Sequence, residues 1–316
     1  HRAPLHQHHQ NGELGGAHLA VENVSNIATK VIQDARIGGS PLEKSSRYVW
    51  FNKKVNGQYQ FYRDPVLMES PHAQRYLDVQ NYLFDVYTAM VDPMIKYIEE
   101  GLPRDEGVTE GAYKATVRAK ACDAIRGILP AGTQTNMGVF GNGRFFESLI
   151  AKMRCHPLSE MQNIAGDMQT ALDAVVPSFV RRSHADHRHF IPYQKFVMET
   201  ERAMDCVTKG ILEHTPITQA EEVELVDYDI DAEVKIVASL MYQHSQHSMA
   251  QLLKLAKNMT YEQRTTVIRE ALVRRENRRH KPVRAFENTY YRFDILGDFG
   301  IYRDLRNSCR YEKVPD

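Results

Sequence analysis

The stretch Arg126-Gly-Ile-Leu-Pro130, with Thr135, Asn142 and Arg144 after it, decides the fold. Proline cannot continue a helical hydrogen-bond ladder, and the residue before it avoids helical backbone angles. A helix over about 110–128 is therefore predicted to end at this stretch. Arg126 at that end would place a forked, permanently charged donor beside a turn, which suits the binding of an anion.

Apolar periodicity predicts further long helices around this stretch. Between Tyr82 and Ile98 the apolar residues recur at steps of three and four, which indicates one buried helical face that is bent at Pro93. Thr260 followed by Gln263 has the spacing of a capping box. Other helices are expected over 138–154, 158–175, 231–256 and 261–277.

Strand signals are concentrated in the first 62 residues. Asn56-Gly57 separates two aromatic, β-prone runs, 47–51 and 59–62, and this arrangement predicts a β-hairpin. Residues 13–36 indicate mixed helix and strand.

Composition indicates an ordinary globular protein. The 316 residues are 42% hydrophobic, and Lys+Arg and Asp+Glu both number 40, so no overall field favours nucleic acid or a membrane. The four cysteines are far apart and form no C-x-x-C pair, which disfavours a disulfide framework and a zinc ribbon. No apolar run approaches eighteen residues, and a cytoplasmic location is expected.

The chain is predicted to have two modules joined by a connection. A loose echo of Val21–Lys30 in Phe293–Tyr302 suggests that the second module is partial. The His-rich start favours a disordered tail over a metal-binding tract or a tag remnant. The expected parts are a tail over 1–12, a first module over 13–175, a connection over 176–229 and a mostly helical partial module over 230–316.

Two patches carry a resemblance to a known family. The first, Ser40–Tyr48, resembles the signature R-H-R-x-x-S-x-N-E-x-S-x-R-Y of the flavin-dependent thymidylate synthases. The chain departs from it at Leu42, in place of the asparagine, and at Ala35-Arg36-Ile37, in place of R-H-R. The matching residues are Ser40, Glu43, Ser45, Arg47 and Tyr48.

The second patch follows the C-terminal half of the same family, with a one-residue shift after Arg144. Its residues are Arg126, Leu129, Pro130, Thr135, Asn142, Arg144, Arg154, His156 and Glu160.

The resemblance implies an α+β fold in which long helices pack on a twisted, mostly antiparallel sheet. It also implies the reductive methylation of deoxyuridine monophosphate, with methylenetetrahydrofolate as carbon donor, reduced FAD as hydride source and NADPH as cosubstrate. A pyrimidine nucleotide ligand and a homo-oligomer or tandem-module assembly are expected, whereas a metal, a membrane and nucleic acid are not.

The same resemblance assigns roles to nine residues. Arg154 would polarise the uracil ring by stabilising developing negative charge, and Lys152 is its rival for that position. Glu43, Ser45, Arg47 and Arg126 would bind the substrate. Ser40, Asn142, Arg144 and His156 would bind flavin and folate.

The departure from R-H-R leaves alternatives open. Ala35 and Ile37 remove two cationic donors, each able to make hydrogen bonds worth about 1.5–3 kcal/mol. Either another module or subunit supplies them, or the chain is a degenerate homologue that acts as a nucleotide-binding or structural partner.

Two further motifs, His184–His189 and the basic run Arg274–Lys281, are expected to be solvated surface rather than a metal or nucleic-acid site.

Overall fold

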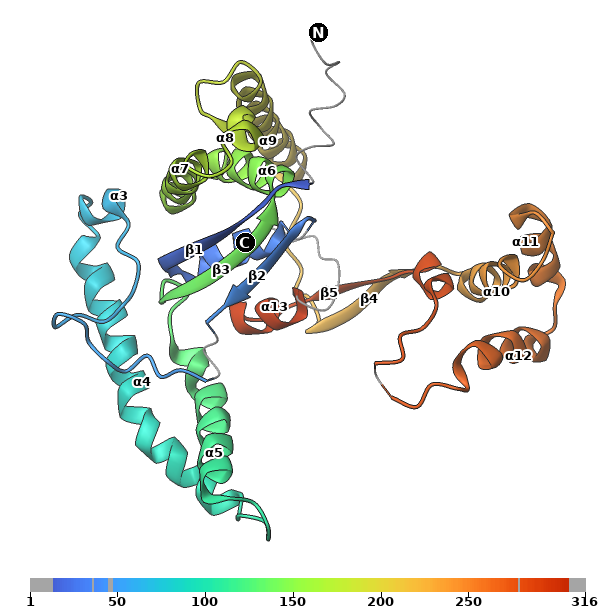
Figure 1. Cartoon of the computed structure of the whole chain (residues 1–316), viewed down its shortest axis with the longest axis horizontal. Helices are drawn as coiled ribbons and strands as arrows, with labels where there is room; N and C mark the ends of the chain where they lie inside the picture. The colour runs from blue at the N-terminus through green and yellow to red at the C-terminus, as the bar shows by residue number, and fades with distance from the viewer. Residues whose placement is uncertain (1–13, 36, 45–47, 278, 307–316) are drawn as a thin grey trace. The chain divides into compact units, whose positions relative to one another are not determined.

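The computed structural model describes residues 14–35, 37–44, 48–277 and 279–306. The chain divides into two compact units, His1–Thr215 and Pro216–Asp316. Helices dominate both units, and each unit contains a small antiparallel sheet (Figure 1). The predicted α+β class is therefore confirmed.

The sheet of the first unit has three strands, β1 (Gly16–Ser25), β2 (Gly39–Glu43) and β3 (Gln134–Asn142), in the order β1-β3-β2. Both pairings are antiparallel. In β3 the buried residues alternate with less buried ones, so every second side chain faces the core. The expected helix over 138–154 is consequently wrong for 138–142, which belong to this strand, and correct from Gly143 onward.

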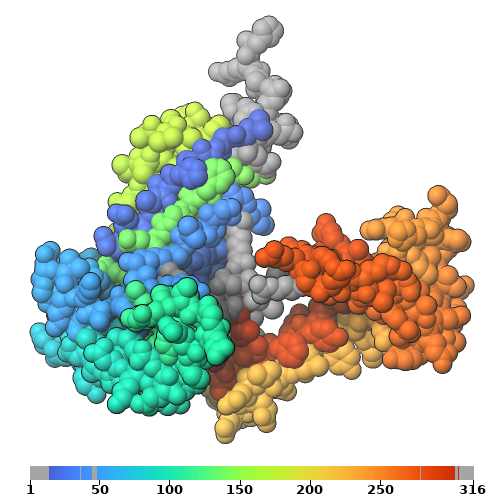
Figure 2. Space-filling model, turned by 60° about the horizontal axis from the view of Figure 1, so that its bottom comes forward, coloured from blue at the N-terminus to red at the C-terminus, as the bar shows by residue number. Residues whose placement is uncertain are grey.

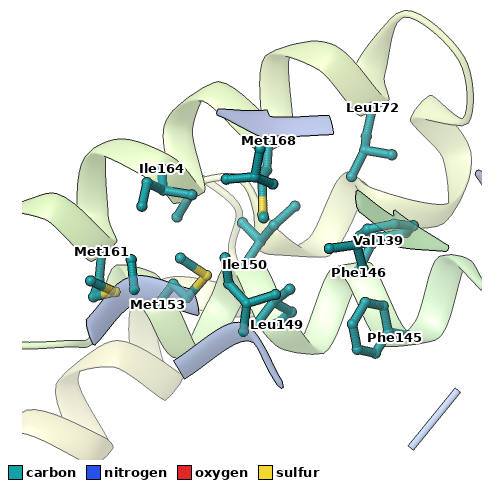
Figure 3. Close-up of a cluster of buried hydrophobic side chains, with 14 of the residues drawn as sticks. Val139, Phe145, Phe146, Leu149, Ile150, Met153, Met161, Ile164, Met168 and Leu172 are labelled. Carbon is teal, nitrogen blue, oxygen red and sulfur yellow. The ribbon is translucent and has the colours of Figure 1, made fainter. Parts of the chain in front are cut away.

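The main core lies between the sheet and three helices, α2 (Asn26–Asp34), α6 (Gly143–Arg154) and α7 (Ser159–Asp173). Figure 3 shows the apolar face of α6 meeting that of α7. The predicted helix over 158–175 is confirmed. The largest fully buried core side chains are Ile32, Phe146, Leu149, Ile150, Met153, Met161 and Leu172.

Two long helices form an arm of the first unit. The predicted helix around Pro93 is confirmed as α4 (Ala73–Gly101), and the helix before Pro130 as α5 (Glu110–Ile125) with a 3-10 turn, η1 (Arg126–Ile128). Tyr87, Val91 and Ile125 bury the contact between them. In Figure 2 the two helices form one continuous mass of side chains.

The predicted hairpin is confirmed only at its turn. Asn56 and Gly57 both have positive φ, 50° and 78°, and Val55 and Gln58 exchange both backbone hydrogen bonds. Neither flanking run forms a strand in the described chain. In the second run Phe61 makes an isolated bridge to Thr133, and residues 48–51 of the first run make no bridge.

Three short elements and one long helix complete the first unit: α3 (Pro65–Met68), α8 (Pro177–Val180), η2 (Arg181–Ser183) and the long α9 (Phe190–Leu212). A helix such as α9 was not expected in the 176–229 connection. Only Phe190 of α9 is buried, although the helix also carries exposed apolar side chains such as Ile191, Phe196 and Ile211. Within the described ranges, no helix combines the length and the apolar character needed to cross a membrane.

The second unit pairs β4 (Val223–Tyr228) with β5 (Tyr291–Ile295). Its small helical core is formed by α10 (Ala232–Tyr242), α11 (Met249–Asn258) and α12 (Tyr261–Leu272). The single helix expected over 231–256 is wrong, because Ser248 starts α11 with a capping box. The capping box at Thr260 is confirmed. The unit also contains η3 (Arg284–Asn288) and α13 (Phe299–Arg306).

The Phe145 ring packs against the glycines at which β2 pairs with β3. Gly39 and Gly141 are cross-strand partners, and a Cβ on either would lie 2.3 Å from an atom of the Phe145 ring. We expect Gly141→Ala to lower the free energy of unfolding by about 1–3 kcal/mol, measured by urea denaturation, because overpacking forces the ring to move. Gly138→Ala on the same strand is the control, since its Cβ would meet nothing within 4 Å. Equal losses in the two variants would contradict this account.

Candidate functional site

Glu43, a predicted substrate ligand, is held against α2. Its Oε1 accepts from Thr29 Oγ1 at 3.2 Å and its Oε2 from Gln33 Nε2 at 2.7 Å. Lys30 Nζ lies 3.9 Å from Oε2, and both charged side chains are at most 10% exposed. Glu43 thus ends β2 in a buried polar cluster, whereas Ser45 and Arg47 lie outside the described residues.

Three predicted cofactor residues gather at the other end of β2. Asn142 caps α6, with its Oδ1 accepting from Phe145 N at 2.8 Å, and its backbone N donates to Gly38 O at 3.1 Å. Arg144 is exposed in the first turn of α6. Ser40 pairs with Phe140 on β3, roughly 10 Å along the strand from Glu43 at the usual strand rise.

Arg126 stands at the C-terminal end of α5. Its Nε lies 3.0 Å from Asp123 Oδ1, and its side chain is 22% exposed. The guanidinium is therefore engaged with a neighbouring carboxylate at a helix end, beside the turn that the sequence predicted.

Arg154 is the last residue of α6, and His156 follows two residues later. Arg154 Nε donates to Ser183 O at 2.9 Å. Both residues line a cavity of about 360 Å³, whereas Lys152, the rival for the Arg154 position, is exposed and does not line it. The remaining lining residues are Cys155, Pro157, Gln162, Gln194, Met198, Glu201 and Arg202.

Burial governs the charge states beside this cavity. It lowers the pKa of Arg154, which the Asp173 carboxylate partly opposes. It also lowers the pKa of His156, with Glu201 acting in the opposite direction. The pocket therefore favours a neutral imidazole next to a guanidinium.

The sequence did not identify the α9 side chains of this cavity. Gln194, Met198 and Glu201 are spaced by four and then three residues, which places them on one helical face. That spacing was the available signal, but the sequence prediction treated these residues as part of the 176–229 connection.

Glu160 belongs to the second patch, and its contacts are structural. It is 6% exposed. Its Oε1 accepts from Ser25 N at 2.7 Å and its Oε2 from Ser25 Oγ at 2.6 Å. Because Ser25 caps α2, Glu160 ties α7 to the junction of β1 and α2.

The titration of Glu160 leads to a test. Burial raises its pKa above the ordinary 4.5, although the Ser25 hydrogen bonds oppose the shift. The protonated carboxyl thus contributes stability that is full below pH 4.5 and is lost as the pH rises through the raised pKa. We expect the stability of the wild type relative to Glu160→Gln to fall over that range, by up to about 1.4 kcal/mol per pH unit.

Urea denaturation at several pH values measures this difference. Asp167→Asn, which alters an exposed carboxylate of the same helix, is the control. A stability difference that stays constant or grows with pH would be inconsistent with a raised pKa.

The other charged motifs have local partners. His184 Nε2 lies 3.1 Å from Asp173 Oδ1, and Arg274 Nη2 lies 2.9 Å from Glu270 Oε2. In the described part of the chain, no three His, Cys, Asp or Glu side chains are grouped to hold a metal ion.

A family model described as "Thymidylate synthase complementing protein" matches residues 2–178. Curated relatives match across both units. A UPF0159 protein of Chlamydia pneumoniae is 44% identical over 299 residues, covering 93% of this chain and 56% of its own length. One from Thermoplasma acidophilum is 31% identical over 318 residues, covering 93% and 61%. The chain therefore spans little more than half the length of these relatives.

Among solved structures, the chain is similar to a UMP/dUMP methylase PolB from Streptomyces cacaoi, crystallised with 5-Br UMP. The identity is 14% and the TM-score 0.38, over 56% of this chain and 78% of that one. A likeness this low supports no statement about ligands.

Proposed function

Because the chain belongs to the family of thymidylate synthase complementing proteins, which its residues 2–178 match, we propose that it acts in the methylation of deoxyuridine monophosphate to thymidylate. The observation that carries the proposal is the placement of Arg154 and His156 in the cavity at the end of α6. Asn142 and Arg144 stand at the opposite end of the same helix. The helix α6 thus contains Arg144 and Arg154, and Asn142 and His156 flank its two ends.

Arg154 is proposed to stabilise charge on the substrate. Its contact with Ser183 O fixes the guanidinium before any ligand arrives. A fixed donor in a partly desolvated site is most effective where negative charge develops, as on a uracil ring whose C5 becomes nucleophilic.

Flavin binding is only partly provided for by the described residues. Ser40, Asn142 and Arg144 could serve the polar groups of FAD, but Ala35 and Ile37 have no side-chain donor, and Ile37 is 96% exposed. These residues do not complete a flavin site, and we assign no step to FAD. When bound, reduced FAD would supply the hydride for the methylation.

The missing donors favour a second candidate function. A degenerate homologue would keep the nucleotide pocket and act as a binding or structural partner. The relatives are longer than this chain. In the alternative that retains catalysis, the rest of a protein of that length supplies the cationic donors that Ala35 and Ile37 lack.

One set of measurements separates the two functions. Under the first, the protein takes up FAD, turns yellow and releases tritium from C5-labelled deoxyuridine monophosphate. Under the second, it binds the nucleotide in calorimetry but stays colourless and releases no tritium. A protein that does not bind the nucleotide would refute both.

Arg126 is proposed to contact the nucleotide phosphate. We expect Arg126→Ala to weaken the binding of deoxyuridine monophosphate by about 10- to 100-fold, the usual value of a hydrogen bond to a charged group, while folding is retained. Calorimetry measures the affinity. Lys120→Ala, which removes an exposed charge from the same helix, is the control, and unchanged affinity for Arg126→Ala would remove Arg126 from the site.

A further inference from the structure

Two residues of α2, Lys30 and Gln33, lie in neither sequence patch but connect to a predicted substrate ligand. Gln33 Nε2 donates to Glu43 Oε2 at 2.7 Å, and Gln33 Oε1 accepts from Lys30 Nζ at 2.5 Å. Lys30 Nζ and Glu43 Oε2 are 3.9 Å apart. The amide of Gln33 thus bridges a buried pair of opposite charges between α2 and the end of β2.

The bridging amide has only one possible orientation. An ammonium group only donates hydrogen bonds and a carboxylate only accepts them, so the amide oxygen must face Lys30 and the amide nitrogen must face Glu43. Thr29 Oγ1 donates to the other carboxylate oxygen, Oε1, at 3.2 Å. Thr29 and Lys30 precede Gln33 by four and three residues, which places all three on one helical face. That face therefore holds both oxygens of the Glu43 carboxylate.

Burial makes this arrangement costly for the fold. Lys30 is 5% exposed, and the Glu43 side chain is 10% exposed. Replacing a buried ion pair by apolar residues of similar volume is often neutral or stabilising. Stability alone therefore does not account for the cluster, whereas a fixed acceptor for a ligand does.

The backbone beside the carboxylate is held independently of α2. Glu43 pairs with Met137 on β3, and the next residue, Lys44, donates its N–H to Asn136 O at 3.0 Å. A change in the α2 side chains should consequently alter the direction of the Glu43 carboxylate without moving the strand.

We propose that Lys30 and Gln33 are positioning residues that hold the Glu43 carboxylate in one orientation for the nucleotide. This inference rests on the proposed function. Because a carboxylate accepts but does not donate, Glu43 receives an N–H or O–H donor of deoxyuridine monophosphate, either the ring N3–H or the sugar hydroxyl, and not its phosphate. An acceptor that is fixed beforehand binds such a donor more tightly than a mobile one, since less side-chain freedom is lost on binding.

Calorimetry with deoxyuridine monophosphate on the 316-residue chain tests the positioning role. Gln33→Met removes the bridge but keeps both charges, and it is expected to weaken binding by about 10-fold, the usual effect of one hydrogen bond to a charged group. The control is Gln74→Met on α4, which removes an exposed amide that donates to Asp78 Oδ1 at 2.8 Å. This control should leave the affinity unchanged.

A second set of variants separates positioning from a purely structural role. Lys30→Met removes one charge of the buried pair and should lower both the urea midpoint and the affinity. The double variant Lys30→Met with Glu43→Gln removes both charges, so it should regain stability. Its affinity should stay as low as that of Glu43→Gln alone, about 10- to 100-fold below the wild type, because the carboxylate that contacts the nucleotide is missing.

Two outcomes would overturn the inference and leave the proposed function intact. The first is equal affinity in Gln33→Met and Gln74→Met. The second is a double variant whose affinity returns together with its stability, which would give the charge pair a structural role only. A wild type that does not bind deoxyuridine monophosphate would overturn the proposed function as well.

Discussion

Phe146→Ala is expected to lower the free energy of unfolding by about 3–5 kcal/mol, the usual cost of removing a fully buried aromatic ring. Phe146 is 0% exposed and lies in the core between the sheet, α6 and α7 (Figure 3). Its ring also makes an edge contact with Phe145, with ring centroids 5.1 Å apart. Since helices support this core from several sides, the cavity should collapse only in part. Urea denaturation, followed by circular dichroism, measures the loss.

The matched control is Phe196→Ala on α9, where the ring is 66% exposed. Surface substitutions of this kind usually change stability by less than about 0.5 kcal/mol. A loss below about 1 kcal/mol for Phe146, or equal losses at both positions, would show that the core of the first unit is not the one described.

The helices could be predicted from the sequence where their apolar periodicity is strong. Tyr87 and Val91 repeat at the helical step and bury one face of α4. The strand β3 was missed because its pairing is non-local. Gly16 faces Asn142 and Gly39 faces Gly141, and no local pattern in 134–142 reveals partners about 100 residues away.

The candidate site shows the same division between local and non-local information. The cap at Asn142 follows from a few adjacent residues. Lys152 and Arg154, however, occupy the same last turn of α6, so spacing could not separate them. Their environments differ because Ser183, 29 residues further along the chain, receives the Arg154 hydrogen bond.

That difference leads to the second large effect. If Arg154 stabilises charge on the uracil ring, Arg154→Gln should lower kcat for thymidylate formation by about 100- to 1000-fold, as the loss of one preorganised donor does in other enzymes. Lys152 lies in the same last turn of α6 and is exposed. Lys152→Gln should therefore leave kcat nearly unchanged. The affinity for deoxyuridine monophosphate, measured by calorimetry, should change less than kcat in Arg154→Gln, because the interaction strengthens only as charge develops.

The structural contact of Arg154 must be separated from this catalytic role. Loss of the hydrogen bond to Ser183 O would destabilise η2. That structural effect would lower the urea midpoint of unfolding without a matching change in kcat. Arg154→Lys keeps the charge but not the forked geometry, so it should recover part of kcat if charge alone stabilises the ring. Two outcomes would contradict a catalytic role for Arg154: equal losses of kcat in the Lys152 and Arg154 variants, or a loss of kcat that parallels the loss of stability. Arg154 would then only connect α6 to η2 through its hydrogen bond to Ser183 O.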